Sequence, residues 1–237
     1  MRLALLLLLV PAVAHAQDEF EIQVYDVATA HQGEPGIELH INEHLFHGRA
    51  DETHTTFEPH YGLRDWLELG GYLQSSVANG EHYEFAGAKL RLKARMPQRY
   101  WDGRIGLAVN GELSIIPSQF EPAVYGSEIR PIAELRSGRL FAAINPVVTV
   151  DLAGDLAGHP QLEPCAKVAV FVSESIGLGV EAYGAFGPID DLGSEEVERG
   201  FVTFDYLGRA VDLDVGVGAN HGSEDHPVFK LILGIHP

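Results

Sequence analysis

The sequence predicts an all-β protein, an antiparallel up-and-down transmembrane β-barrel of about twelve strands. Three observations predict it. The N-terminus has the pattern of a secretory signal peptide, apolar and polar residues alternate along most of the remaining chain, and short connections alternate with longer ones. This combination is typical of a porin-like protein in the outer membrane of a Gram-negative bacterium.

Residues 1–16 are predicted to be the signal peptide. Arg2 gives a short positive region, residues 3–10 form an unbroken apolar run, and Ala14-His15-Ala16 places small residues before the expected cleavage site. The run is too short for a transmembrane helix, which needs about 20 apolar residues. The mature chain is therefore expected to be exported and to begin at Gln17.

Residues 17–35 are predicted to be an N-terminal periplasmic segment or a partial strand. In this stretch Phe20, Ile22 and Val24 alternate weakly with polar neighbours, and a polar link leads to Pro35. The barrel itself is expected to occupy residues 36–237.

Period-two alternation defines the strands of the predicted barrel. Around Arg91, for example, leucine and alanine alternate with lysine and arginine, which is the pattern of a strand with one apolar and one polar face. The segments match the roughly 9–11 residues that a tilted strand needs to cross a bilayer, and their number is even. They span residues 36–46, 53–63, 66–76, 83–95, 104–115, 125–136, 139–150, 161–173, 175–186, 199–207, 211–220 and 227–236.

The connections between these segments alternate in length. Arg64-Asp65 and Ser137-Gly138 are tight turns, whereas residues 48–52 and 187–198 form longer polar loops. Short turns at one end and long loops at the other are characteristic of outer-membrane barrels. The stretch 96–103 is the exception, since it is long where a short turn is expected.

The polar face of the strands is expected to line the lumen, and the apolar face to contact lipid. A barrel of twelve strands is too wide for side chains alone to fill, so an apolar interior would leave voids. A soluble β-barrel or sandwich with the opposite orientation remains the alternative. The predicted lumen-lining residues are Glu38, His40, His44, His54, Glu58, His60, Glu68, Lys89, Arg91, Lys93, Asn110, Glu112, Glu128, Arg130, Glu134, Arg136, Glu163, Lys167, Glu181, Asp205, Asp212, Asp214 and Lys230.

The predicted lumen is charged unevenly. Lys89, Arg91 and Lys93 form a basic ladder on one strand, whereas carboxylates dominate the three strands before it and the strands expected at 175–186, 199–207 and 211–220. A basic wall that faces an acidic wall would orient and filter polar solutes. In the alternative arrangement the charges pair across the lumen and plug it.

The charge balance argues against nucleic acid as a partner. The full chain carries a formal net charge of −18, and without Arg2 the mature chain has 15 basic against 34 acidic side chains, a net −19. The expected partners are outer-membrane lipid, the barrel-assembly machinery and a small polar or aromatic solute. The single cysteine, Cys165, excludes an internal disulfide and is expected to be buried or to face the lumen.

No catalytic or cofactor site is predicted. The sequence contains no Gly-x-Ser-x-Gly and no His-Glu-x-x-His motif. His40, His44, His54 and His60 share the predicted lumen face with two glutamates, and such side chains are good zinc ligands. Their spacing is no recognised metal signature, so they are interpreted as polar lumen residues, with a metal site as the alternative.

The stretch from Glu58 to Gly70 resembles the strand–turn–strand hairpin of the outer-membrane β-barrel family named for the MetA pathway of phenol degradation. The shared features are Pro59-His60-Tyr61-Gly62, a tight turn, and the apolar-Glu-apolar strand Leu67-Glu68-Leu69. The resemblance covers about 40 residues. It implies an outer-membrane barrel for the uptake of small compounds, aromatic ones included, and it transfers no catalytic residue.

The sequence thus predicts a non-enzymatic, channel-like barrel for small solutes, with a charged polar lumen. Two alternatives stay open. One is a structural barrel that does not conduct. The other is a lipid-modifying enzyme of the outer membrane, a lipid hydrolase or acyltransferase.

Overall fold

Regular structure in the computed structural model consists of β-strands. The model describes residues 19–78, 82–120, 123–154, 157–193, 197–221 and 226–236, so the predicted signal peptide lies outside the described residues. No helix in these ranges is long and apolar enough to pass through a membrane. The described strands are β1 (Pro35–His44), β2 (Glu52–Arg64), β3 (Leu67–Ala78), β4 (Glu84–Arg95), β5 (Ile105–Ile115), β6 (Tyr125–Ser137), β7 (Leu140–Asn145), β8 (Val148–Asp151), β9 (Pro160–Leu162), β10 (Cys165–Phe171), β11 (Ile176–Ala185), β12 (Val197–Leu207), β13 (Val211–His221) and β14 (His226–Ile235).

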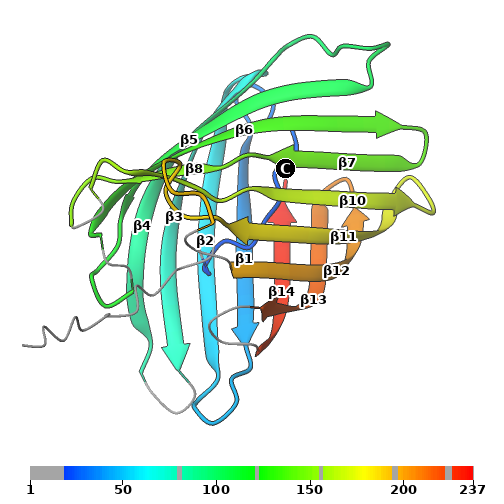
Figure 1. Ribbon diagram of the computed structural model, residues 1–237. Coiled ribbons are helices and arrows are strands. Elements are labelled where there is room, and N and C mark those ends of the chain that lie inside the picture. The colour runs from blue at the N-terminus through cyan, green and yellow to red at the C-terminus, as the bar shows by residue number, and fades with distance from the viewer. Residues whose placement is uncertain are drawn as a thin grey trace, which may run out of the picture.

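The sheet closes into a barrel. Each strand pairs antiparallel with its neighbour around the ring, and β1 pairs with both β2 and β14, so that the first and last strands form the closing seam (Figure 1). The ring contains twelve of the described strands, and β8 and β9 are additional to it. The predicted twelve-stranded antiparallel barrel is therefore confirmed. Closure also leaves the ring without an open edge for aggregation.

Two of the predicted strands are each divided in the structure. The segment 139–150 becomes β7 and β8, and the segment 161–173 becomes β9 and β10. Pro146 and Pro164 lie at the two breaks. Proline has no backbone N–H for the ladder, which explains why the pairing stops there. Beyond the first break β8 resumes pairing with β6 in the register that β7 had set.

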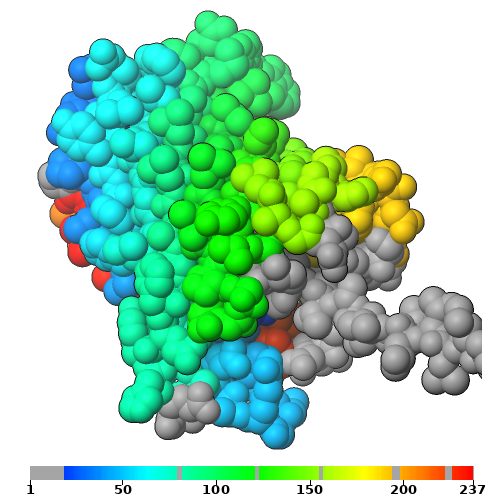
Figure 2. Space-filling view, turned by 90° about the vertical axis from the view of Figure 1, so that its left-hand side faces the viewer, coloured from blue at the N-terminus to red at the C-terminus, as the bar shows by residue number. Residues whose placement is uncertain are grey.

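The apolar face of the strands points outward. On β4, Leu90 and Leu92 are 57% and 48% exposed, whereas Arg91 and Lys93 on the opposite face are 4% and 6% exposed. A soluble protein would show the reverse arrangement, and a barrel surrounded by lipid requires the one observed. Figure 2 shows the outer side chains of β2 to β5, cyan to green, covering one side of the barrel, with the chain around β8 and β9 standing out beside it.

The first part of the N-terminal segment, residues 19–27, lies inside the barrel (Figure 1), and the chain emerges over residues 28–34, most of which are exposed. The sequence predicted a periplasmic segment or partial strand for residues 17–35. In the structure residues 19–34 form no strand, and Phe20, Ile22 and Tyr25 are each at most 5% exposed. Side chains that looked like one half of an incomplete strand are thus buried against the inner wall.

Candidate functional site

The lumen gathers most of the polar residues that the sequence assigned to it. The buried ones are His40, His44, His54, Glu58, His60, Glu68, Arg91, Lys93, Asn110, Glu112, Glu128, Arg130, Glu134, Lys167, Glu181, Asp205 and Lys230. Those of intermediate burial are Glu38, Lys89, Glu163, Asp212 and Asp214, and Arg136 is exposed. Buried charges at this density require partners, because an unpaired charge away from water is costly.

The N-terminal segment crosses the lumen from one end to the other. At its start, the Glu19 carbonyl accepts a hydrogen bond from Asn42 at 3.0 Å, near the end of β1. Further along, the Gln32 N–H donates to Asp65 Oδ1 at 3.0 Å, in the turn after β2. Because β2 spans the barrel between these two points, the segment runs through the interior rather than across one mouth.

The exit of the segment is fixed at the turn between β2 and β3. The hydrogen bond from the Gln32 N–H holds the pKa of the Asp65 carboxyl below its usual range, and the nearby His31 acts in the same direction. A carboxyl whose pKa is lowered stays charged down to more acidic pH. This contact is therefore expected to persist throughout the neutral range.

Asn145 binds the backbone of the segment where the wall is interrupted. Its Oδ1 accepts from the Tyr25 N–H at 2.7 Å, and its Nδ2 donates to the Tyr25 carbonyl at 3.0 Å. Asn145 is the last residue of β7, directly before Pro146. Its side-chain amide therefore binds the N-terminal segment, which forms no strand over the described residues 19–34. These bonds satisfy the backbone N–H and the backbone carbonyl of Tyr25, which would otherwise be costly to bury.

A central cluster joins the segment to strands β3 to β6. The Tyr25 hydroxyl donates to Glu21 and lies 2.5 Å from the Tyr72 hydroxyl. The Arg130 guanidinium lies 3.8 Å from Glu21 and stacks 4.3 Å above the Tyr25 ring. Glu21 is fully buried, and its contacts with Tyr25 and Arg130 are made by its Oε1, whereas Lys89 approaches its Oε2 at 3.7 Å.

The opposite side of the segment is apolar. Ile22 and Val24 pack in one buried cluster with wall residues that include Phe141, Ala169 and Phe201. The weak alternation noted in the sequence thus has a structural meaning. Side chains on one face of the segment contact polar residues of β3 to β6, and those on the other face contact apolar residues of β7, β10 and β12. The match of both faces favours a defined position for the segment.

The basic ladder of β4 is paired with carboxylates. Arg91 lies 2.7 Å from Glu58 on β2 and 2.6 Å from Glu68 on the adjacent strand β3. Lys93 lies 3.8 Å from Asp26 of the segment, so this pair joins wall and segment. Arg91 and Lys93 of the ladder therefore pair with nearby carboxylates, and they do not face a distant acidic wall across an open lumen.

A second ion-pair network lies across the barrel on β10 to β14. Lys167 contacts Asp205 at 2.5 Å and Asp214 at 2.7 Å. Lys230 contacts Glu181 at 2.5 Å, and it also donates to the Ile22 carbonyl of the segment at 3.4 Å. Both halves of the lumen thus hold the segment through charged groups.

A cavity of about 610 Å³ remains beside the segment. It reaches from the middle of the lumen to the end that carries the short turns, and side chains of both charges line it. Representative lining residues are Asp26, Glu38, Lys93, Lys167, Asp205 and His236. Its size is in the range of pockets that hold small molecules.

Several interior residues were missed by the sequence reasoning. Tyr72 follows the same period-two parity as Glu68, and that parity was the available signal for it. Arg199 is the third residue of β12 and His226 is the first residue of β14, where the alternation was too short to show a face. Asn145 had no signal in the pattern, because its role depends on the break at Pro146.

Comparisons with known proteins support the fold. No protein-family model matches the sequence, and no curated protein sequence matches it. The structure is similar to that of an outer membrane channel from Pseudomonas putida F1, with a TM-score of 0.60, 11% identity, and coverage of 92% of this chain and 100% of that chain. It is also similar to the NanC porin, with a TM-score of 0.58, 6% identity, and coverage of 83% and 98%.

A third similar structure is the KdgM porin in complex with disordered oligogalacturonate, with a TM-score of 0.54, 10% identity, and coverage of 84% and 98%. At such low identities these similarities establish a shared barrel fold and nothing finer. The resemblance to the phenol-degradation family has no matching family model behind it and stays a prediction.

Proposed function

We propose that this chain is an outer-membrane channel for small polar solutes, and that its own N-terminal segment occludes the lumen. The observation that carries the proposal is the polar interior of a closed barrel whose outer face is apolar. Lipid solvates such an outer face, and water or a polar solute solvates such an inner one. The signal peptide ending near Ala16 supplies the expected route of export.

The cavity beside the segment supports small solutes over polymers. Lysine, arginine and carboxylate side chains line the same space, so a solute with hydrogen-bonding groups or with both charges finds partners there. The aromatic compounds implied by the resemblance to the phenol-degradation family fit within this size class. The lining supplies no grouping that favours catalysis over passage, so we propose a protein that is not an enzyme.

A structural barrel that does not conduct is the second candidate. The observation that favours it is the density of ion pairs between the segment and both walls, since charge pairs across a lumen close it. The two candidates differ in whether the segment can leave its position while the barrel stays folded.

Reconstitution in planar bilayers separates the candidates. We expect the mature chain to give rare, brief openings under voltage, and liposomes that contain it to swell slowly in small sugars and amino acids. Heat-modifiable gel migration verifies that the barrel is folded. If the mature chain and the chain without residues 19–30 both fail to conduct while folded, the protein is a structural barrel and the channel proposal is wrong.

A further inference from the structure

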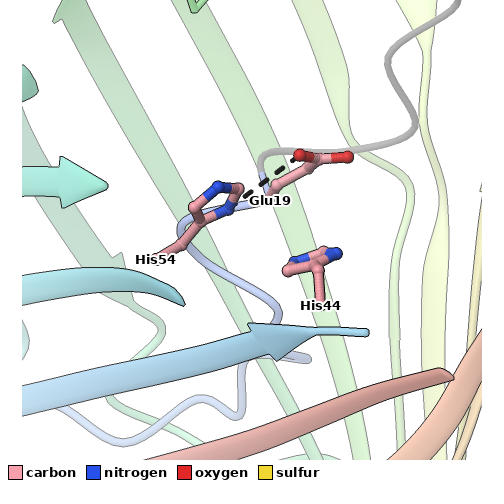
Figure 3. A group of neighbouring side chains, drawn as sticks. All are labelled: Glu19, His44 and His54. Carbon is pink, nitrogen blue, oxygen red and sulfur yellow. Dashed lines mark ion pairs between the residues drawn. The ribbon is translucent and has the colours of Figure 1, made fainter. Parts of the chain in front are cut away.

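Three potential metal ligands meet where the N-terminal segment begins its path through the barrel. His44 ends β1, His54 lies near the start of β2, and Glu19 belongs to the segment (Figure 3). One ligand atom from each of the three residues lies within 4.8 Å of the other two. His44 and His54 are 0% and 3% exposed, so the imidazoles are shielded from bulk water.

Two ring nitrogens of this group have no hydrogen-bond partner among the described residues. They are His44 Nε2 and His54 Nδ1. A buried polar atom without a partner costs about 1–3 kcal/mol, so each such atom calls for an explanation. Both belong to the side chain that zinc-class metals bind most often.

The remaining atoms of the group are already positioned by other contacts. His44 Nδ1 lies 3.0 Å from His226 Nε2, and His54 Nε2 lies 3.4 Å from Glu52. Glu19 directs one carboxylate oxygen toward Arg199 at 3.8 Å and the other toward His54 Nδ1 at 3.9 Å. Imidazoles that bind metal commonly have their second nitrogen held in this way, which fixes the ring and its tautomer.

We infer that Glu19, His44 and His54 bind one divalent cation of the zinc class, through the carboxylate, His44 Nε2 and His54 Nδ1. Two histidines and one glutamate form an established donor set for zinc, and a fourth position stays open for water. The ligand atoms lie within 4.8 Å of one another, and binding of one ion would draw them closer together. One ligand comes from the segment and two from the wall, so the metal joins the segment to the barrel.

A second group of three potential metal ligands differs because its histidine already pairs with its two carboxylates. Glu38, His40 and Glu58 also lie close together, but His40 Nε2 already pairs with both glutamates, at 3.6 and 3.2 Å. Arg91 adds a guanidinium 2.7 Å from Glu58. A cation thus already occupies the place that a metal would take, which makes His40 a suitable control position.

Zinc titration of the refolded mature chain tests the inference. We expect one Zn²⁺ per barrel by calorimetry, and His44→Gln or His54→Gln should weaken binding by at least about tenfold. The controls His40→Gln and the exposed His31→Gln should retain the affinity of the parent. Unchanged affinity in the first two variants, or equal loss in the controls, would overturn the assignment.

A spectroscopic measurement keeps the test independent of the variants' folding. Cu²⁺ bound to the parent chain should show an electron paramagnetic resonance spectrum with coupling to two imidazole nitrogens. A spectrum without nitrogen coupling overturns the site.

The link between metal and segment has its own readout. Zn²⁺ should slow amide hydrogen exchange of residues 19–34 in the parent chain and leave it unchanged in Glu19→Gln. If zinc binds but exchange of the segment stays the same, the metal does not join segment and wall. This result leaves the channel proposal untouched, because a channel needs no metal to conduct.

Discussion

Deletion of residues 19–30 is expected to turn a barrel of low conductance into one with a large and stable conductance. These residues contain the groups that fill the lumen, including the buried Ile22 and Tyr25. A twelve-stranded ring is too wide for its own side chains to close, so the emptied lumen will fill with water. Reversal potentials in a salt gradient then report which lumen charges lose their partners.

A milder variant tests the same point without shortening the chain. A Cβ at Gly62 would overlap the His31 carbonyl oxygen and lie 2.7 Å from that of Ala30, so Gly62→Ala pushes the segment away from the wall. Gly111→Ala is the matched control, because the nearest atom to its Cβ would be 3.9 Å away. We expect more frequent openings in Gly62→Ala only. Equal conductance of the parent, the deletion and Gly62→Ala would show that the segment does not limit passage.

Replacement of Arg130 by methionine is expected to lower the free energy of unfolding by about 3–5 kcal/mol. Arg130 is 1% exposed and pairs with Glu128 at 2.7 Å, and it also contacts Glu21 and the Tyr25 ring. Its removal takes from the buried Glu128 the cation that lies 2.7 Å away, and it takes from Glu21 one of two neighbouring cations, the other being Lys89 at 3.7 Å. Urea titration of the refolded barrel in detergent measures the change.

Arg136→Met is a closely matched control for this substitution. Arg136 lies on the same strand and also bonds the glutamate two residues before it, Glu134, at 2.9 Å. Its side chain is 42% exposed, so solvent screens the pair and the expected loss is below about 1 kcal/mol. Similar losses in both variants would mean that Arg130 is not buried in the manner described.

The barrel itself was predictable from the sequence because one local rule determines it. Alternation with period two assigns each side chain to a face, and closure of the ring then turns one face inward all at once. The same rule placed Arg91, Lys167 and Lys230 in the interior. The divided strands were not predictable in this way, since the alternation continues through Pro146 and Pro164 although the hydrogen bonds do not.

The position of the N-terminal segment was beyond sequence reasoning for a different physical reason. Its two faces match walls built from strands far along the chain, so complementarity exists only after the ring has closed. Phe20, Ile22 and Val24 alone look like half of a strand, and Glu21 alone looks like its solvated face. The local alternation of apolar and polar residues does not indicate that Glu21 pairs with Arg130 or that Tyr25 pairs with Asn145.

Labelling of Cys165 tests the central claim, that the segment lies in the lumen, most directly. This single cysteine is 2% exposed, packs in one cluster with Ile22 and Val24, and has its sulfur 3.9 Å from the Gln23 carbonyl oxygen. A small methanethiosulfonate reagent should label it slowly in the folded mature chain and rapidly once residues 19–30 are deleted. Rapid labelling of the folded, full mature chain would contradict the account.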